Sequence, residues 1–150
     1  MTFVEIDREQ TPWTLLLEAD PSRERIESYL HSGTVVGMFD DDSLVGVFVL
    51  TPVHNGSIEL MNIAVDAPYR GQGYGTRLLA EAIGRARALG ARQITVGTGN
   101  SSLGQLAFYQ KAGFRIVGVD PDYFTRNYPE PIEENGIPCR DMIRLALVLL

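Results

Sequence analysis

The sequence predicts one α+β domain, an α/β three-layer sandwich in which helices flank a mixed, mostly antiparallel sheet. Three strand-like runs follow one another with short turns between them, which indicates an antiparallel meander. Helical and strand-like runs then alternate, and the two helical runs end at glycines, Gly90 and Gly113. A chain of 150 residues is long enough to form one domain with a real core, so we expect a single domain over residues 1–150.

The first half of the chain contains the expected meander. Its strands are expected at Thr34–Phe39, Leu44–Leu50 and Ile58–Val65. An acidic turn, Asp40-Asp41-Asp42, joins the first two strands, and Asn55-Gly56, a strong hairpin signal, leads into the third. Two helices are expected before the meander, over residues 13–18 and 21–30. Asp20-Pro21 is typical of an N-cap followed by a proline in the first turn, and predicts where the second helix starts.

The second half of the chain is expected to contain two helices and three strands. The helices are predicted to end near residues 89 and 112, and the strands to cover 93–96, 114–119 and 142–149. Ser102 and Gln105 match a capping box at the start of the second helix. Residues 120–138 are expected to be a long loop, rich in aromatic and acidic residues. A loop of this length often forms part of a binding site.

Composition excludes several classes of protein. A formal net charge of -6 disfavours a nucleic-acid partner, which usually meets a basic face. The single cysteine, Cys139, rules out an intramolecular disulfide, and neither His31 nor His54 has neighbours at metal-ligand spacing. The N-terminus lacks a signal-peptide pattern, and the apolar run at 145–150 is too short to span a membrane. We therefore expect a cytoplasmic protein with no metal, nucleic-acid or membrane partner, whose apolar end at 143–150 could support a homodimer.

The segment Arg70-Gly71-Gln72-Gly73-Tyr74-Gly75 says most about function. It lies between the strand that ends at Val65 and an amphipathic helix pattern with apolar residues from Leu78 to Leu89. Closely spaced glycines let the backbone bend around a ligand. The unpaired N–H groups at the start of a helix are a natural phosphate site. The segment therefore predicts a phosphate-binding loop.

The glycine segment and a later, tyrosine-bearing stretch resemble two motifs of the GNAT superfamily of acyl-CoA-dependent N-acetyltransferases, and they stand in the order of that family. The cofactor motif of that family is Gln or Arg, two residues, Gly, one residue, then Gly or Ala, and the segment from Arg70 to Gly75 matches it. The stretch from Leu106 to Phe114 resembles the second motif, a helix that carries a tyrosine, here Tyr109. The family usually has an asparagine seven residues before this tyrosine. That position is Ser102 here, and Asn100 lies two residues further back.

The resemblance implies that the chain transfers an acetyl group from acetyl-CoA to a primary amine. Main-chain groups of the glycine segment would hold the pyrophosphate of the cofactor, and those of the preceding strand would pair with its pantetheine arm. The residues implied for cofactor binding are Ile63, Ala64, Val65, Arg70, Gly71, Gln72, Gly73, Tyr74, Gly75, Thr76, Asn100 and Ser102. The acceptor is a small-molecule amine or a protein amino group, and the sequence does not identify it further.

The reaction needs a base, because an alkylamine is mostly protonated at neutral pH. Glu59 is the candidate, and strand alternation places it on the same face as Met61, Ile63 and Val65. A water-relayed proton transfer is the alternative. Tyr109 would donate a proton to the leaving thiolate, and backbone N–H groups near the end of the 58–65 strand could stabilise the charge on the thioester oxygen.

Two other interpretations compete with this one. Gly97 and Gly99, a following helix and then Asp120 imitate a dinucleotide-binding unit, which would indicate an NAD-dependent oxidoreductase. The third glycine is replaced by Ser102, and too few residues follow for a doubly wound sheet. The chain could also be a sensor that binds acyl-CoA without catalysis, although Glu59 and Tyr109 are both present.

Overall fold

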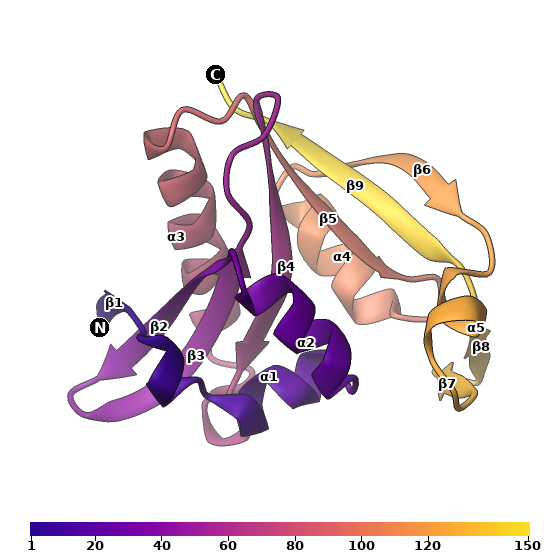
Figure 1. The fold of residues 1–150 in the computed structure, drawn as a ribbon, viewed down its shortest axis with the longest axis horizontal. Coiled ribbons are helices and arrows are strands. Elements are labelled where there is room, and N and C mark those ends of the chain that lie inside the picture. The colour runs from indigo at the N-terminus through magenta and orange to yellow at the C-terminus, as the bar shows by residue number, and fades with distance from the viewer. The chain divides into compact units, whose positions relative to one another are not determined.

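The computed structural model describes residues 1–150, whose contacts group into two compact units. Unit 1 comprises Met1–Ile94 with Leu150, and unit 2 comprises Thr95–Leu149. Figure 1 shows the helices and strands of both units along the chain. No helix combines the length and the apolar character that crossing a membrane requires.

The longer helices and strands follow one another in the order that the sequence patterns predict, and several short elements are added to them. The elements of unit 1 are β1 (Thr2–Glu5), η1 (Arg8–Gln10), α1 (Trp13–Ala19), α2 (Arg23–Leu30), β2 (Thr34–Asp40), β3 (Ser43–Leu50), β4 (Ser57–Val65), η2 (Ala67–Tyr69) and α3 (Tyr74–Ala88). Strand β5 (Gln93–Gly99) runs from unit 1 into unit 2. The elements of unit 2 that follow are α4 (Leu103–Lys111), β6 (Arg115–Asp120), α5 (Tyr123–Asn127), β7 (Ile132–Glu134), β8 (Ile137–Cys139) and β9 (Met142–Val148).

Unit 1 contains the predicted antiparallel meander. Strands β1, β2, β3 and β4 are neighbours in that order, and each pair is antiparallel. Asn55 and Gly56 have φ angles of 52° and 77°, as expected of the tight turn before β4. Strand β1 was not predicted. It pairs along β2 from Thr2 opposite Phe39, and its four residues are too few to show a clear alternation.

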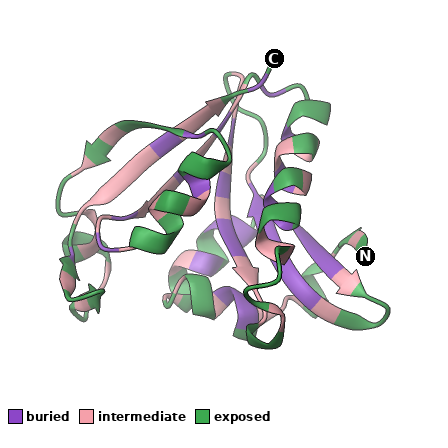
Figure 2. Ribbon diagram, turned by 180° about the vertical axis from the view of Figure 1, so that it is seen from behind, coloured by how far each residue is buried: buried purple, intermediate pink, exposed green.

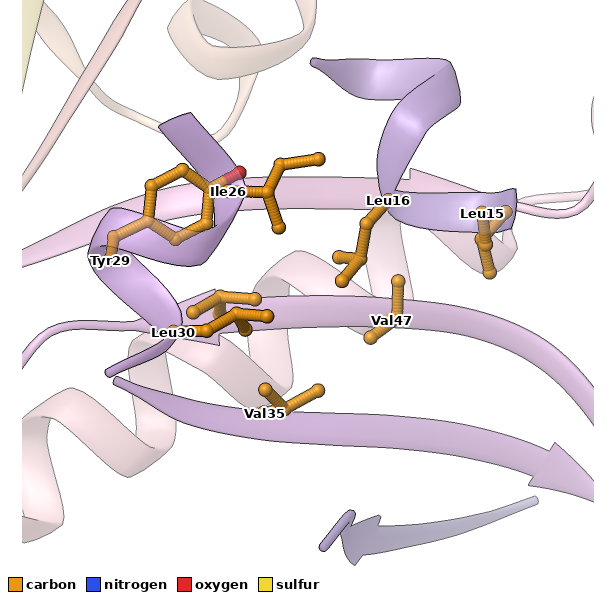
Figure 3. Close-up of a cluster of buried hydrophobic side chains, with 8 residues drawn as sticks. Leu15, Leu16, Ile26, Tyr29, Leu30, Val35 and Val47 are labelled. Atoms are coloured by element: carbon orange, nitrogen blue, oxygen red, sulfur yellow. The ribbon is translucent and has the colours of Figure 1, made fainter. Parts of the chain in front are cut away.

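Helices cover both faces of this sheet, which gives unit 1 three layers (Figure 1). Leu16 of α1 and Ile26 of α2 pack on one face with Val47 of β3, in the cluster drawn in Figure 3. On the other face, a Cβ atom at Gly46 would lie 2.9 Å from Leu78 of α3. Figure 2 shows that the strands between these layers are largely buried. Helix α2 begins two residues later than Asp20-Pro21 predicts, because Ser22 is its N-cap and accepts a hydrogen bond from the Arg25 N–H.

Strand β4 carries a bulge that decides where its side chains point. Val49 of β3 pairs with Asn62, but the next residue, Leu50, pairs with Leu60, so Met61 has no partner of its own. A one-residue shift of this kind moves side chains to the opposite face. Residues on the two sides of the bulge therefore do not share one simple alternation.

Unit 2 contains the strands β5, β9 and β6 as neighbours in that order, with β6 antiparallel to β9. The segment 120–138, expected to be a loop, instead contains helix α5 and most of a small hairpin made of β7 and β8. Short elements of three to five residues have little periodicity, so the sequence pattern did not show them. The predicted mixed, mostly antiparallel sheet flanked by helices is confirmed.

Candidate functional site

The glycine segment forms an open loop at the start of α3. Gly71 and Gly73 have φ angles of 75° and 84°, which residues with a Cβ atom rarely adopt. A Cβ atom built on either glycine would find no other atom within 4 Å. The space beside these two residues is therefore open, and the backbone is exposed to whatever binds there.

The first turn of α3 offers its N–H groups to this space. The first hydrogen bond of the helix runs from the Arg77 N–H to the Gly73 carbonyl, so the N–H groups of Tyr74, Gly75 and Thr76 have no helical acceptor. No acidic residue lies in this turn. The positive end of a 15-residue helix dipole adds to the attraction for an anion. The loop and the helix start thus fit a phosphate group.

Side chains of the same segment tie it to the rest of unit 1. The Nε of Arg70 donates to the Val65 carbonyl at 2.9 Å, and its NH2 group lies 2.6 Å from a carboxylate oxygen of Glu18 in α1. The amide of Gln72 donates to the Pro68 carbonyl at 3.1 Å. Both side chains therefore have partners within the protein, and they hold the loop in place.

The end of β4 turns some of its main-chain groups toward β3 and others away from it. The Asp66 N–H donates to the Val45 carbonyl at 2.8 Å, so this pair is a hydrogen-bonded pair of the antiparallel ladder. Such pairs alternate along the ladder, and the residues between them turn their N–H and C=O groups to the other edge. Ile63 and Val65 are those residues, since they pair with Phe48 and Gly46. On that side of β4 the next strand of the sheet is β5, and the Val65 carbonyl accepts a hydrogen bond from Arg70.

Glu59 does not lie on the face of β4 that simple alternation predicts. Because of the bulge at Met61, Glu59 shares the α1–α2 face with Asn62, whereas Ile63 faces the α3 side. The expected common face with Ile63 and Val65 was wrong for this physical reason. Glu59 is half-buried, and its main-chain N–H donates to the side-chain Oγ1 of Thr51 at 2.8 Å.

Tyr109 is a buried tyrosine in unit 2. Only 4% of it is exposed, and its ring packs against those of Phe108 and Phe114, with centroids 5.3 and 5.6 Å away. Burial raises the pKa of the Tyr109 phenol well above its ordinary value. The side chain therefore remains a neutral O–H donor at neutral and moderately alkaline pH.

Asn100 and Ser102 both bind the segment that leads to β9. The Asn100 side chain donates to the Pro138 carbonyl at 3.1 Å and accepts from the N–H groups of Arg140 and Asp141. The Ser102 hydroxyl donates to Glu134 at 2.7 Å and makes no cap bond to α4, so the predicted capping box does not form. These bonds show positioning roles that the sequence did not predict. The predicted contacts of both residues with the cofactor remain predictions.

The glycine pair that imitates a dinucleotide-binding loop lies inside a strand. Gly97 and Gly99 belong to β5, and a Cβ atom on either would lie 2.5 Å from the sulfur of Met142 or Cys139. Close packing within unit 2 therefore explains both glycines. No group of three or more His, Cys, Asp or Glu side chains is arranged to hold a metal ion.

Asn62 is a polar residue of this region that the sequence did not single out. It is 5% exposed, on the face of β4 that packs against α1 and α2. The only sequence signal was an asparagine within an apolar strand, which is common beside a turn and uncommon in a buried strand.

Comparisons with known proteins agree with this geometry. A sequence model of the Acetyltransferase (GNAT) family matches residues 2–114. The chain is 47% identical over 137 residues to the N-acetyltransferase YvbK of Bacillus subtilis, an alignment that covers 91% of this chain and 88% of that protein.

Two solved structures resemble the whole chain. The first is an IAA acetyltransferase from Bacillus cereus, with a TM-score of 0.94, 47% identity and 99% of each chain covered. The second is a GNAT family acetyltransferase from Elizabethkingia anophelis with acetyl-CoA bound. Its TM-score is 0.95 and its identity 43%, over 99% of this chain and 97% of that one. The chain thus belongs to the GNAT family of acetyltransferases, and it is an acyltransferase.

Proposed function

We propose that residues 1–150 form one N-acetyltransferase domain that transfers the acetyl group of acetyl-CoA to a primary amine. The observation that carries this proposal is the open loop at Gly71 and Gly73, whose positive φ angles and empty Cβ positions adjoin the N-terminus of α3. A relative with 43% identity binds acetyl-CoA, which supports the same co-substrate here. The thioester supplies an activated acetyl group.

The residues of unit 1 fit the two polar parts of this co-substrate. N–H groups from Gly71 to Thr76 suit the pyrophosphate, since an anion at a helix start is stabilised by the dipole and by unpaired donors. Main-chain groups of Ile63 and Val65, which point away from β3, suit the amides of the pantetheine arm, which can lie along the end of β4 like a strand. Ala64 lies between them and turns its own main-chain groups to β3.

We assign the base to Glu59, acting directly or through a water. The amine must lose a proton before it attacks, and a half-buried carboxylate on β4 can accept it. Glu59 and Asn62 share one face of β4 on either side of the bulge, so the base and a second hydrogen-bond acceptor lie on one side of the strand. An N–H group near the end of β4 would stabilise the negative charge on the acyl oxygen.

We assign the acid to Tyr109. The burial that raises its pKa keeps its proton on the phenol until a stronger base appears nearby. A thiolate in an apolar site is such a base, because burial raises the pKa of a thiol as well. The motif that carries Tyr109 is the second support for this role.

The acceptor is best proposed as a cationic amine, free or on a protein. In unit 2, the rings of Tyr123, Phe124 and Tyr128 form a contiguous group, with centroids 5.2 and 5.5 Å apart. Exposed carboxylates of Glu130 and Glu133 follow in the same segment. Aromatic faces and carboxylates together favour an ammonium group over a neutral acceptor.

Two further proposals concern the whole molecule. We propose that it works in the cytoplasm and can form a homodimer. Within the C-terminal run expected at an interface, Leu145 and Leu149 are buried, while Val148 and Leu150 are exposed. Exposed apolar side chains of the paired strands β6 and β9, namely Ile116, Val117, Val119 and Val148, are the better candidates for a dimer contact.

The test is release of free coenzyme A thiol from acetyl-CoA on addition of a panel of amines, including polyamines, amino acids, aminoglycosides and peptides. We expect that free coenzyme A is released only when at least one of these amines is present. Binding of acetyl-CoA without release under any amine would indicate a sensor. Binding of NAD without binding of acetyl-CoA would indicate an oxidoreductase, and either result rejects the proposal.

A further inference from the structure

Strand β6 forms one edge of the seven-stranded sheet. The order of the strands ends with β5, β9 and β6, so β9 is the only strand beside β6, as Figure 1 shows in unit 2. The main-chain N–H and C=O groups of β6 that point away from β9 therefore lie at an open edge. Such an edge can pair with a further strand, and proteins usually protect it with short strands, charged side chains or bulges.

Large apolar side chains distinguish the edge at β6 from a protected one. Ile116, Val117 and Val119 are each more than half exposed. The other edge of the sheet is β1, which has only four residues and one exposed large apolar side chain, Val4. A contiguous apolar patch on the surface of a protein usually marks an interaction site. The three side chains of β6 form such a patch within four residues.

A bulge at Val117 determines which side chains of β6 share a face. Val117 has no partner of its own on β9, because the pairing shifts by one residue at this point. Ile116 and Val119, on the two sides of the bulge, pair with Leu145 and Ile143. Those two partners lie two positions apart in β9 and share a face, so Ile116 and Val119 share one face as well. A regular strand would place these two residues on opposite faces.

The same bulge places the two charged ends of β6 together on the other face. Arg115 pairs with Ala146 and Asp120 pairs with Met142, and these partners in β9 again lie on one face. Arg115 is exposed, and the carboxylate of Asp120, which lies 3.1 Å from Arg126, is half-exposed. The strand therefore begins with an accessible positive charge and ends with an accessible negative charge.

This arrangement is self-complementary. When two copies of β6 run antiparallel about a two-fold axis at the middle of the strand, Arg115 of one copy lies opposite Asp120 of the second copy. Ile116 of one copy then lies opposite Val119 of the second. Each pair joins side chains on the same face, as an antiparallel ladder requires, because the bulge has placed them there. The bulge, which protects an edge in other sheets, here makes the faces of two copies match.

The middle of the strand leaves room for a partner. In this two-fold arrangement, Val117 of one copy lies opposite Gly118 of the second copy. A Cβ atom built on Gly118 would find no other atom within 4 Å, so the space beside this glycine is open. A branched side chain opposite a glycine avoids a clash between two large residues at the bulge.

We propose that two copies of this chain pair through β6, antiparallel and edge to edge, and so join their sheets across a two-fold axis. The inference deepens the proposed homodimer and rests on it, since it names the strand and the register of the contact. Arg115 and Asp120 form two ion pairs across the axis, and Ile116 and Val119 cover one another. A contact of this size is small, so we expect a dimer dissociation constant on the order of micromolar.

Exchange of the charges tests the strand and its register in the full chain. Arg115→Asp places two aspartates opposite each other at both ends of the contact, and Asp120→Arg places two arginines there. Each variant alone should raise the dimer dissociation constant by about tenfold or more, because two attractive pairs become repulsive. An equimolar mixture of the variants should dimerise with nearly wild-type affinity, since each aspartate again meets an arginine. Sedimentation velocity from about 1 to 200 μM measures the wild type, both variants and their mixture.

Val119→Lys and Val4→Lys form a matched pair of variants. The first puts a positive charge on the apolar face of β6 and should give a monomer. The second puts the same charge on the other edge strand, β1, and should leave dimerisation unchanged. Melting temperatures show whether each variant is folded. If a charge-exchange variant does not fold, this pair is measured against the same criteria.

Three results would reject the inference. A wild type that sediments as a 16.6 kDa monomer up to about 200 μM rejects the proposed homodimer as well. A wild-type dimer that neither charge variant weakens, or that the mixture does not restore, uses another surface. Equal effects of Val119→Lys and Val4→Lys would also exclude β6 as the contact. Coenzyme A release by the wild type is measured separately, so failure of the dimer and failure of the proposed acetyl transfer are distinct results.

Discussion

Arg70 and Glu18 form a short ion pair between the glycine loop and helix α1, with 2.6 Å between the guanidinium and carboxylate atoms. The same guanidinium donates to the Val65 carbonyl at the end of β4. Arg70 therefore connects the strand, the loop and the helix of unit 1. Its first role in the structure is to position the loop, and a direct contact with a phosphate remains a prediction.

Replacing Arg70 tests this positioning role. Arg70→Ala should raise KM for acetyl-CoA by about tenfold, because it removes two bonds that hold the loop. Arg70→Gln should have a smaller effect, since glutamine can still donate to the Val65 carbonyl. The exposed ion pair alone contributes at most about 1 kcal/mol, so Glu18→Gln should change little. Steady-state kinetics of the three variants checks this order, and equal effects of Arg70→Ala and Arg70→Gln would contradict it.

Substitutions of two glycines at opposite ends of α3 distinguish the effect of backbone strain on stability from an effect on ligand binding. Gly73 and Gly90 have φ angles of 84° and 87°, and a Cβ atom on either has open space around it. Alanine at either position should lower the free energy of unfolding by about 1–2 kcal/mol, the cost of a left-handed conformation. Only Gly73→Ala should also raise Kd for acetyl-CoA, because its methyl group enters the proposed phosphate site. Urea unfolding and calorimetric titration measure the two effects, and equal Kd values for both variants would place the phosphate elsewhere.

Much of the fold could be predicted because its local signals are strong. Asn55-Gly56 and the alternating strands indicated the meander, and glycines marked the ends of the long helices. Strand β1, helix α5 and the β7–β8 hairpin were missed, because each is too short to show a period. Their formation depends on contacts with distant segments, such as the pairing of β1 with β2.

The sequence motifs predicted the glycine loop of the candidate site. They did not predict which face of β4 carries Glu59, or which residues the polar side chains of the site contact. The glycine loop stands out because positive φ angles restrict the residue type. The face of Glu59 was predicted wrongly, since a bulge at Met61 leaves no trace in an apolar run. Arg70, Asn100 and Ser102 each form a hydrogen bond with a residue more than 30 positions away in the chain. One sequence alone cannot reveal such distant pairs.

Tyr109→Phe tests the proposed acid. The variant should lower kcat by about 100-fold, a typical contribution of general acid catalysis, and leave KM for acetyl-CoA nearly unchanged. Tyr29→Phe is the control, because Tyr29 is equally buried and has no proposed role in the chemistry. A kcat for Tyr109→Phe within about twofold of the wild type would assign the proton to another donor.

The two buried tyrosines also predict the response to alkaline pH. Burial is the main reason that the pKa values of Tyr29 and Tyr109 rise above the ordinary value of about 10. Above about pH 10 the unfolded chain loses these phenolic protons while the folded chain keeps them, so stability must fall as pH rises. Urea unfolding between about pH 8 and 11 should show this fall, and a smaller one in Tyr109→Phe. An equal fall in the variant would contradict the assignment.

Glu59→Gln tests the proposed base. The variant should lower kcat/KM for the amine at neutral pH and shift the pH–rate profile toward alkaline pH, where the amine is neutral without help. Glu81→Gln serves as a control, because Glu81 is a half-buried glutamate of α3 that pairs with Arg85. A reduced rate with an unshifted profile would favour proton transfer through water to another group.

Transfer of the acetyl group itself is the most direct test of the central claim. The protein is incubated with acetyl-CoA that carries ¹³C in the acetyl group and with an amine from the panel, and the amine is analysed by mass spectrometry. We expect labelled N-acetylamine in an amount equal to the free coenzyme A released, with the product lost in Gly73→Ala at limiting acetyl-CoA. Release of coenzyme A without a labelled amine, or no release with any amine, would contradict it.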